Sequence, residues 1–129
     1  MTLLLDVNLL LAAIWESHPL HEQAFSGIEG HSVAVCPLAE LGFLRISTHP
    51  KVNINVPMAE ARLALKTFLD ERKAQRVPCD LPALDSAPKK SDEVTDHYLA
   101  DLAARHQMKL LTLDANIKHP AVIVAGKVT

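Results

Sequence analysis

Glycine, cysteine and excess basic charge are all scarce in this chain of 129 residues, and each shortage excludes a class of protein. The four glycines form neither a GxGxxG fingerprint nor a P-loop, which excludes the common glycine-rich phosphate-binding loops. Cys36 and Cys79 lack CxxC spacing, which favours reduced thiols in the cytoplasm. The formal net charge of -2 gives no overall basic field, so any contact with nucleic acid depends on local Lys and Arg or on metal ions.

Long apolar runs are also missing. The apolar start MTLLLDVNLLLAAIW is interrupted by Asp6 and has no basic residues before it. It is too short to span a bilayer, so it predicts neither a membrane helix nor a signal peptide. Because 49% of the residues are hydrophobic and the chain contains no repeat or low-complexity tract, we expect one globular domain over residues 1–129.

Apolar runs that suit buried strands alternate along the chain with segments of helical periodicity. The predicted strands are residues 2–5, 32–36, 109–113 and 121–125. The predicted helices follow Asp6, span 19–28, begin at Pro37, and span 57–72 and 92–106, the last with Ser91 as its N-cap. Residues 77–90 are expected to hold one short strand and then a loop. This alternation predicts an α/β fold with a mostly parallel sheet.

Three of the predicted helices carry apolar stripes. The second helix has Leu20, Ala24, Phe25 and Ile28; the third has Leu38, Leu41 and Leu44; the fourth has Ala61, Leu65, Phe68 and Leu69. We expect the stripe of the fourth helix to face the interior. The stripe of the third helix suits either the core or an interface.

Four acidic residues lie where an α/β fold gathers its ligands. Asp6 ends the first predicted strand, and Asp114 follows the strand at 109–113. Glu40 and Asp96 lie near the starts of predicted helices. Because open α/β sheets bind ligands at the carboxyl ends of their strands, we expect these four carboxylates to converge. Two carboxylates roughly 5 Å apart repel by about 3 kcal/mol at an effective dielectric constant near 20, so converging acids need a cation. Mg²⁺ or Mn²⁺ suits such oxygen ligands and supports hydrolysis of phosphate esters.

Each acid also has a purely structural interpretation. An acid at a strand end is often only a turn former or a helix cap, and an acid in the first turn of a helix complements the helix dipole. On the helix of Asp96, Asp92 lies on the same face and is a rival ligand, whereas Asp101 is turned away. The metal-site prediction therefore depends on the joint fit of all four acids to one edge of one sheet.

Three stretches carry a family resemblance: LLLDVNLLLAA, AELGFLRISTHPKV and TDHYLADLAARHQMKLLTLDANI. They resemble PIN-domain nucleases, and more narrowly the VapC-type toxins of bacterial toxin–antitoxin pairs. The resemblance covers nearly the whole chain. It implies a three-layer α/β/α sandwich, Mg²⁺- or Mn²⁺-dependent endoribonuclease activity on RNA, and a homodimer. It also implies a cognate antitoxin whose tail blocks the acidic cleft.

By motif, the resemblance assigns four catalytic, metal-binding acids and three supporting residues. The acids are Asp6, Glu40, Asp96 and Asp114. Asn8 and Thr112 match positions that support these acids by hydrogen bonds. Arg45 is a candidate for contact with a phosphate or with the antitoxin, or else an arginine of the surface or the dimer interface.

The sequence departs from the family pattern at two places. The family usually has Gly near the end of the helix that carries Asp96, where a left-handed cap forms easily; here the sequence is His106-Gln107. An aromatic residue often stands near position 117, which is Ile117 here. Neither departure removes a predicted metal ligand.

Other classes of protein fit the residues less well. His18 and His21 are three apart, but no third or fourth ligand has suitable spacing, which argues against a zinc site. A receiver domain expects paired acids after its first strand, where only Asp6 stands. A haloacid-dehalogenase-type phosphatase needs an acid where Asn8 stands. A PIN fold with little activity that acts by binding a partner protein is a further alternative.

Overall fold

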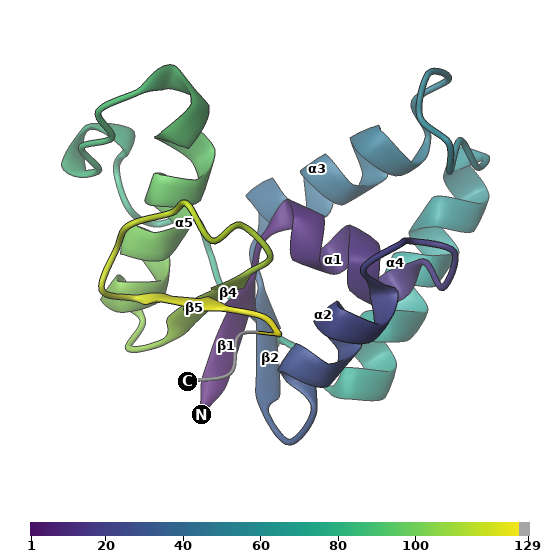
Figure 1. Ribbon diagram of the computed structural model, residues 1–129, viewed down its shortest axis with the longest axis horizontal. Helices are drawn as coiled ribbons and strands as arrows, with labels where there is room; N and C mark the ends of the chain where they lie inside the picture. Colours follow the sequence, from purple (N-terminus) through teal and green to yellow (C-terminus); the bar gives the residue numbers. More distant parts are fainter. Residues whose placement is uncertain (127–129) are drawn as a thin grey trace.

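A five-stranded, fully parallel sheet runs through the centre of the computed structural model, which describes residues 1–126 (Figure 1). In chain order the strands are β1 (Thr2–Leu5), β2 (Ser32–Val35), β3 (Gln75–Arg76), β4 (Lys109–Thr112) and β5 (Val122–Val124). Their spatial order is β3-β2-β1-β4-β5. The chain therefore builds outward from β1 to β3, then returns to the other side of β1 with β4. This reversal creates a switch point between β1 and β4.

Helices cover both faces of this sheet. They are α1 (Val7–Ile14), α2 (His21–Ile28), α3 (Pro37–Ser47), α4 (Met58–Arg72) and α5 (Val94–Arg105). In Figure 1, α1, α2 and α4 lie on one side, with α3 packed against α1 and α4, and α5 lies on the other side. Right-handed crossovers require this arrangement, because the connection through α5 runs in the opposite direction across the sheet. The predicted α/β fold with a central parallel sheet is confirmed.

The three central strands are buried on both faces. Leu3, Leu4 and Leu5 are at most 1% exposed, and the apolar residues of β2 and β4 are similarly covered. A strand with helices on both sides has no solvent face, so its sequence is a continuous apolar run rather than an alternating one. The same reason made these strands easy to predict.

A close approach between α1 and α3 fixes the helices that begin at the carboxyl ends of β1 and β2. A Cβ atom at Gly42 would lie 2.6 Å from a methyl carbon of Val7, so only glycine fits at this contact. Farther along the pair, the rings of Trp15 and Phe43 stack at 5.7 Å. The indole N–H of Trp15 donates to the hydroxyl of buried Ser47 at 2.9 Å. Both helices are thus held by specific packing.

The helix α5 ends in a left-handed cap although no glycine is present. Gln107 has a φ of 62°, and its N–H donates to the carbonyl of Ala104 at 3.0 Å. The N–H of Met108 donates to the carbonyl of Ala103 at 2.8 Å. The backbone thus keeps the cap geometry that glycine adopts most easily, with a side chain in a region that disfavours it.

Two predicted boundaries near α5 were wrong. Ser91 does not cap a helix: residues Ser91–Glu93 form a turn of 3-10 helix, and α5 begins at Val94 after Glu93. The short strand expected within residues 77–90 is β3, which precedes that range. A second 3-10 turn, Ala83–Asp85, occupies the range instead. Proline and acidic residues crowd this segment, so local periodicity gave no clear boundary.

Two of the three predicted apolar stripes are partly exposed. Leu20 and Phe25 of the α2 stripe are 40% and 44% exposed, and the guanidinium of Arg72 lies 4.7 Å from the Phe25 ring. On α3, Leu38 and Leu41 face solvent, because a spacing of three drifts around a helix away from the buried side. The predicted α4 stripe is buried. Among the described residues, no helix has the length and hydropathy needed to cross a bilayer.

Candidate functional site

The switch point of the sheet lies between two of the predicted acids. Leu5 pairs with Leu111 across β1 and β4, so Asp6 and Thr112 are the next residues along the two strands. The backbone N–H of Asp6 reaches the Leu111 carbonyl at 3.4 Å. Asp114 follows Thr112 closely. The fold therefore delivers Asp6 and Asp114 to the same edge from neighbouring strands, as the sequence predicted.

Asp6 is a buried carboxylate with one firm local role. It is 2% exposed, and its Oδ1 accepts the N–H of Leu9 at 2.7 Å as the N-cap of α1. Burial raises the pKa of Asp6 from 3.8 to about 6. The Thr112 hydroxyl and the Leu9 amide counteract this rise, and the charges of Asp96 and Asp114 add to it. The charges of two other predicted acids thus act on Asp6.

Asp96 and Asp114 complete this group from α5 and from the turn after β4. Burial raises the pKa of half-buried Asp96, and the charge of Asp114 raises it further. Asp114 is more exposed, but its conformation is fixed. Its backbone N–H donates to the Thr112 hydroxyl at 3.1 Å, and its Oδ1 accepts the N–H of Asn116 at 2.8 Å. Thr112 is fully buried and lies between the two acids that flank the switch point.

The other predicted residues lie farther from this group. Glu40 is half-buried in the first turn of α3, which follows β2, so the topology places it at the same edge of the sheet. Its charge is not among the causes that shift the pKa of Asp6 or Asp96. Asn8 in α1 and Arg45 in the last turn of α3 are exposed. Their side chains remain available to a substrate or a partner.

A cleft of about 220 Å³ opens beside the acidic group. Asp96 and Asp114 line it, and Asp6 lies beneath the surface rather than in its wall. The remaining lining residues are Lys90, Asp92, Glu93, His97, Asn116, Ile117 and Lys118. Acidic side chains outnumber lysines in this wall, so an anionic substrate is repelled unless cations enter with it.

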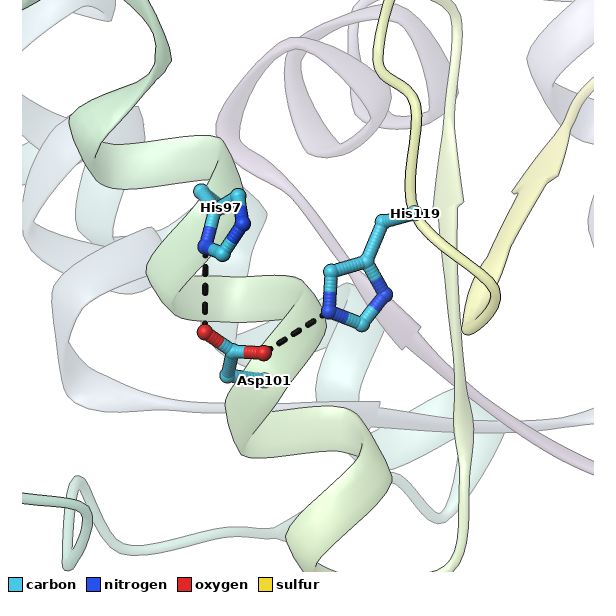
Figure 2. A group of neighbouring side chains, drawn as sticks. All are labelled: His97, Asp101 and His119. Carbon is cyan, nitrogen blue, oxygen red and sulfur yellow. Dashed lines mark hydrogen bonds and ion pairs between the residues drawn. The ribbon is translucent and has the colours of Figure 1, made fainter. Parts of the chain in front are cut away.

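A second cluster beside the cleft was missed by the sequence analysis. His97 and Asp101 on α5 and His119 on the β4–β5 connection point toward one another (Figure 2). Within residues 1–126 they form the group of three whose ligand atoms all lie within 4.8 Å, which is close enough to hold a metal ion. Among the described residues, the edge acids do not meet that spacing. The i, i+4 spacing of His97 and Asp101 was the available signal.

The hydrogen bonds of this cluster, however, fix the position of the ring proton of His119. His119 accepts the N–H of Ala121 on Nδ1 at 3.0 Å, so its neutral ring carries the proton on Nε2 and donates to Asp101 at 2.7 Å. The same His-Pro turn occurs at His18 and His49, whose Nδ1 atoms accept the N–H two residues on. A metal ion at Nε2 of His119 would displace the ring proton to Nδ1. Nδ1 could then no longer accept the N–H of Ala121, and the turn would lose its hydrogen bond. We therefore interpret the cluster as a hydrogen-bonded clamp.

Comparison with known proteins identifies the family. No protein-family model matches the chain. Ribonuclease VapC38 of Mycobacterium tuberculosis is 35% identical over 125 residues, which cover 88% of this chain and 86% of that protein. Ribonuclease VapC44 of the same organism is 33% identical over 139 residues, which cover 98% of this chain and 96% of that protein. The chain belongs to the VapC ribonuclease family.

The VapC assignment agrees with the fold. The structure of VapBC2 from Rickettsia felis, bound to a DNA fragment from their promoter, matches with a TM-score of 0.62 at 13% identity. The match covers 96% of this chain and 97% of that chain. The strand order also separates this VapC chain from a receiver domain, whose order is 2-1-3-4-5 rather than 3-2-1-4-5.

Proposed function

We propose that this VapC chain is an Mg²⁺- or Mn²⁺-dependent endoribonuclease that hydrolyses RNA phosphodiester bonds and acts as the toxin of a toxin–antitoxin pair. The observation that supports the proposal is the proximity of Asp6, Asp96 and Asp114 at the switch point: the charges of Asp96 and Asp114 raise the pKa of Asp6, and the charge of Asp114 raises the pKa of Asp96. The names of the M. tuberculosis relatives support ribonuclease activity.

The chemistry of the acidic edge fits a hard divalent cation. Its donors are carboxylate oxygens, the ligands that Mg²⁺ and Mn²⁺ prefer. Burial and mutual repulsion both disfavour ionised Asp6 and Asp96, and a bound cation reverses both effects. Asp6, Asp96 and Asp114 would hold the ion, with Glu40 entering from α3. When bound, such an ion activates water and stabilises the charge that develops on the scissile phosphate.

The chain itself supplies rigidity around these acids. Asp6 is fixed by the Leu9 amide, and Thr112 fixes the backbone of Asp114. Carboxylates held in advance spend little energy on reorganisation when charge develops on the substrate. Asn8 and Arg45 are exposed, and we propose them as contacts for RNA or for the antitoxin.

A protein partner and a homodimer form part of the same proposal. On α3, Leu41 is 64% exposed, and on α4, Leu63 is equally exposed. We propose these two helices as the surface that contacts protein. Co-expression with the product of the neighbouring reading frame is expected to give a co-purifying complex without nuclease activity. Light scattering on the isolated toxin is expected to give the mass of two chains. A monomer in isolation would refute the dimer, and an unbound or uninhibited toxin would refute the antitoxin.

The direct test of the activity is cleavage of single-stranded and structured RNA by EDTA-treated protein. Adding roughly 5 mM MgCl₂ or MnCl₂ is expected to start cleavage and to raise the Tm, because an ion that binds only the folded state stabilises it. The matched control is Asp70→Asn, which removes an exposed carboxylate paired with Lys66. This variant should respond to metal like the wild type. Absence of cleavage with either metal would leave a PIN fold that acts only by binding protein.

A further inference from the structure

Two lysines from different segments of the chain line the acidic cleft. Lys90 precedes the 3-10 turn that leads into α5, and Lys118 lies on the connection between β4 and β5. Both line the cleft together with Asp96 and Asp114. Within residues 1–126, neither lysine takes part in a salt bridge, although four acidic residues line the same cleft. Their charges therefore remain free to meet an anion.

The two segments that carry these lysines, which form two walls of the cleft, are both hydrogen-bonded to the side chain of Asp101. Asp101 accepts the Ser86 hydroxyl on Oδ2 at 2.7 Å, which anchors the segment leading to Lys90. Its Oδ1 accepts Nε2–H of His119 at 2.7 Å, which anchors the connection that carries Lys118. His97 lies 3.0 Å from Oδ2 (Figure 2). Ser86 is buried, and His119 is only 11% exposed, so water competes little for these bonds.

This clamp sets the position of both walls relative to Asp96. Burial acts to raise the pKa of Asp101, but the hydrogen bonds from His119 and Ser86 outweigh it, so the pKa is lowered overall. Asp101 is thus a stable anion that accepts hydrogen bonds from Ser86 and His119. Ser86 and His119 lie only a few residues from Lys90 and Lys118. The backbone beside each lysine is therefore held in place by the hydrogen bonds to Asp101.

We propose that Lys90 and Lys118 grip two backbone phosphates of a single RNA strand, one on each side of the phosphate held over Asp96 and Asp114. This inference rests on the proposed nuclease function and names how that function binds its substrate. A strand that crosses the cleft brings its phosphates to both walls. Each lysine offsets part of the repulsion from the acidic floor. Because phosphates are the same in every nucleotide, the grip is independent of base sequence.

The test compares Lys90→Ala and Lys118→Ala with Lys89→Ala. Lys89 is the neighbouring exposed lysine and does not line the cleft, so it is a matched control. In the presence of saturating MgCl₂, each cleft variant is expected to raise KM several-fold with kcat little changed, because a contact shared by ground state and transition state affects binding alone. The increase should be the same for RNAs of different sequence. Lys89→Ala should match the wild type.

Salt dependence supplies a readout that loss of structure would not produce. The slope of log(kcat/KM) against log salt concentration should become shallower by about 0.7 for each cleft lysine removed, since each phosphate contact on a single strand releases that fraction of a counterion. The Lys89→Ala slope should stay unchanged. Lys118→Arg, which keeps the charge, is expected to restore KM.

The outcomes separate this inference from the proposed function. If the wild type cleaves RNA but the cleft variants keep its KM and salt slope, the phosphate grip is wrong and the nuclease proposal stands. If a cleft variant loses kcat while its KM and slope are unchanged, the lysine acts on the chemistry and not on binding, which also overturns the grip. If the wild type fails to cleave RNA with either metal, the proposed function itself fails. Far-UV circular dichroism and Tm identify any variant that is misfolded. If Lys118→Ala is misfolded, Lys118→Glu replaces it in the same measurements.

Discussion

Asp96 and Asp101 lie little more than one turn apart on α5, yet their surroundings act on them in opposite directions. Burial and the charge of Asp114 raise the pKa of Asp96. For Asp101, burial also acts to raise the pKa, but hydrogen bonds from His119 and Ser86 prevail and lower it. Within residues 1–126, α5 thus carries one acid, Asp96, without a hydrogen bond or ion pair, and another, Asp101, that accepts two side-chain hydrogen bonds. Under the proposed function the first acid receives a cation, whereas the second holds segments of the protein together.

The same contrast extends to the elements around each acid. The acidic edge gathers Asp6, Asp96 and Asp114 at the switch point, with few donors for their negative charge. The clamp around Asp101 joins side chains from three separate segments. The proposed cation would offset the repulsion at the edge, whereas the hydrogen bonds of the clamp form without a ligand. The proposed site and the structural clamp therefore lie on the same helix but use different acids.

The largest expected effect comes from Asp6→Asn. Asparagine keeps the N-cap bond to Leu9, so the fold should persist, but the charge that binds the cation is lost. Single-turnover cleavage of a fluorescent RNA with MgCl₂ should fall by about 100- to 1,000-fold, the loss typical of removing one group that stabilises developing charge. A rate within a few-fold of wild type would exclude Asp6 as a catalytic ligand.

A second prediction concerns the pH dependence of stability in EDTA. Because the pKa of Asp6 is raised in the folded state, its contribution to stability is fully present below pH 3.8 and is lost as the pH rises through about 6. The rise from 3.8 to about 6 corresponds to about 3 kcal/mol. The free energy of unfolding of wild type minus Asp6→Asn should therefore decrease between pH 4 and pH 7. A flat difference would show that Asp6 is not buried as an uncompensated acid.

The clamp predicts the opposite slope. Because the pKa of Asp101 is lowered in the folded state, its contribution is present above pH 3.8 and is lost as the pH falls through its folded pKa. Asp101→Asn should lower the free energy of unfolding by about 1.5 to 3 kcal/mol at pH 7, the range for hydrogen bonds to a charged group. Urea unfolding at pH 7 and pH 3 measures this difference, which should shrink in acid. Equal destabilisation at both values would refute the charged clamp.

Packing beneath the acidic edge provides a third comparison. Gly42→Ala places a methyl group against Val7, so α1 and α3 must separate. We expect a loss of about 1 to 3 kcal/mol of stability, the range for overpacked cores. Val7→Ala in the same chain should recover most of this loss by making room. If Gly42→Ala is neutral in chemical denaturation, the close contact between these helices is not required.

The smallest effect is expected at the C-terminal end of α5, the helix that carries both Asp96 and Asp101. Gln107→Gly removes a side chain from a φ of 62° and should stabilise the protein by about 1 kcal/mol. The increase in Tm should be the same with and without MgCl₂, because the cap contacts neither region. A destabilised variant would mean that the Gln107 side chain contributes more than its backbone strain costs.

These two regions also differ in how far the sequence predicts them. The placement of Asp6 and Asp114 follows from continuous apolar runs, because buried parallel strands have a simple signature and their carboxyl ends share one edge. The fold class and the placement of these two acids could therefore be derived before any coordinates. The boundary at Ser91 could not, because the α-helix competes there with a 3-10 turn of nearly the same sequence pattern.

The clamp was beyond sequence reasoning for a different reason. Ser86, Asp101 and His119 are far apart in the chain, and none carries a local motif that requires the others. Their contact depends on how the segment before α5 and the β4–β5 connection settle against that helix. At Gln107 the family pattern indicated the position of a left-handed cap, but the residue type did not, because no glycine stands there. Local sequence patterns predict the sheet and its acidic edge, whereas the clamp depends on tertiary packing.

The most direct test of the central claim is the position of Mn²⁺ in crystals of the protein, located by its anomalous scattering. The account predicts a Mn²⁺ ion bounded by carboxylate oxygens of Asp6, Asp96 and Asp114. Mn²⁺ found only between His97, Asp101 and His119, with nothing at the acidic edge, would contradict it.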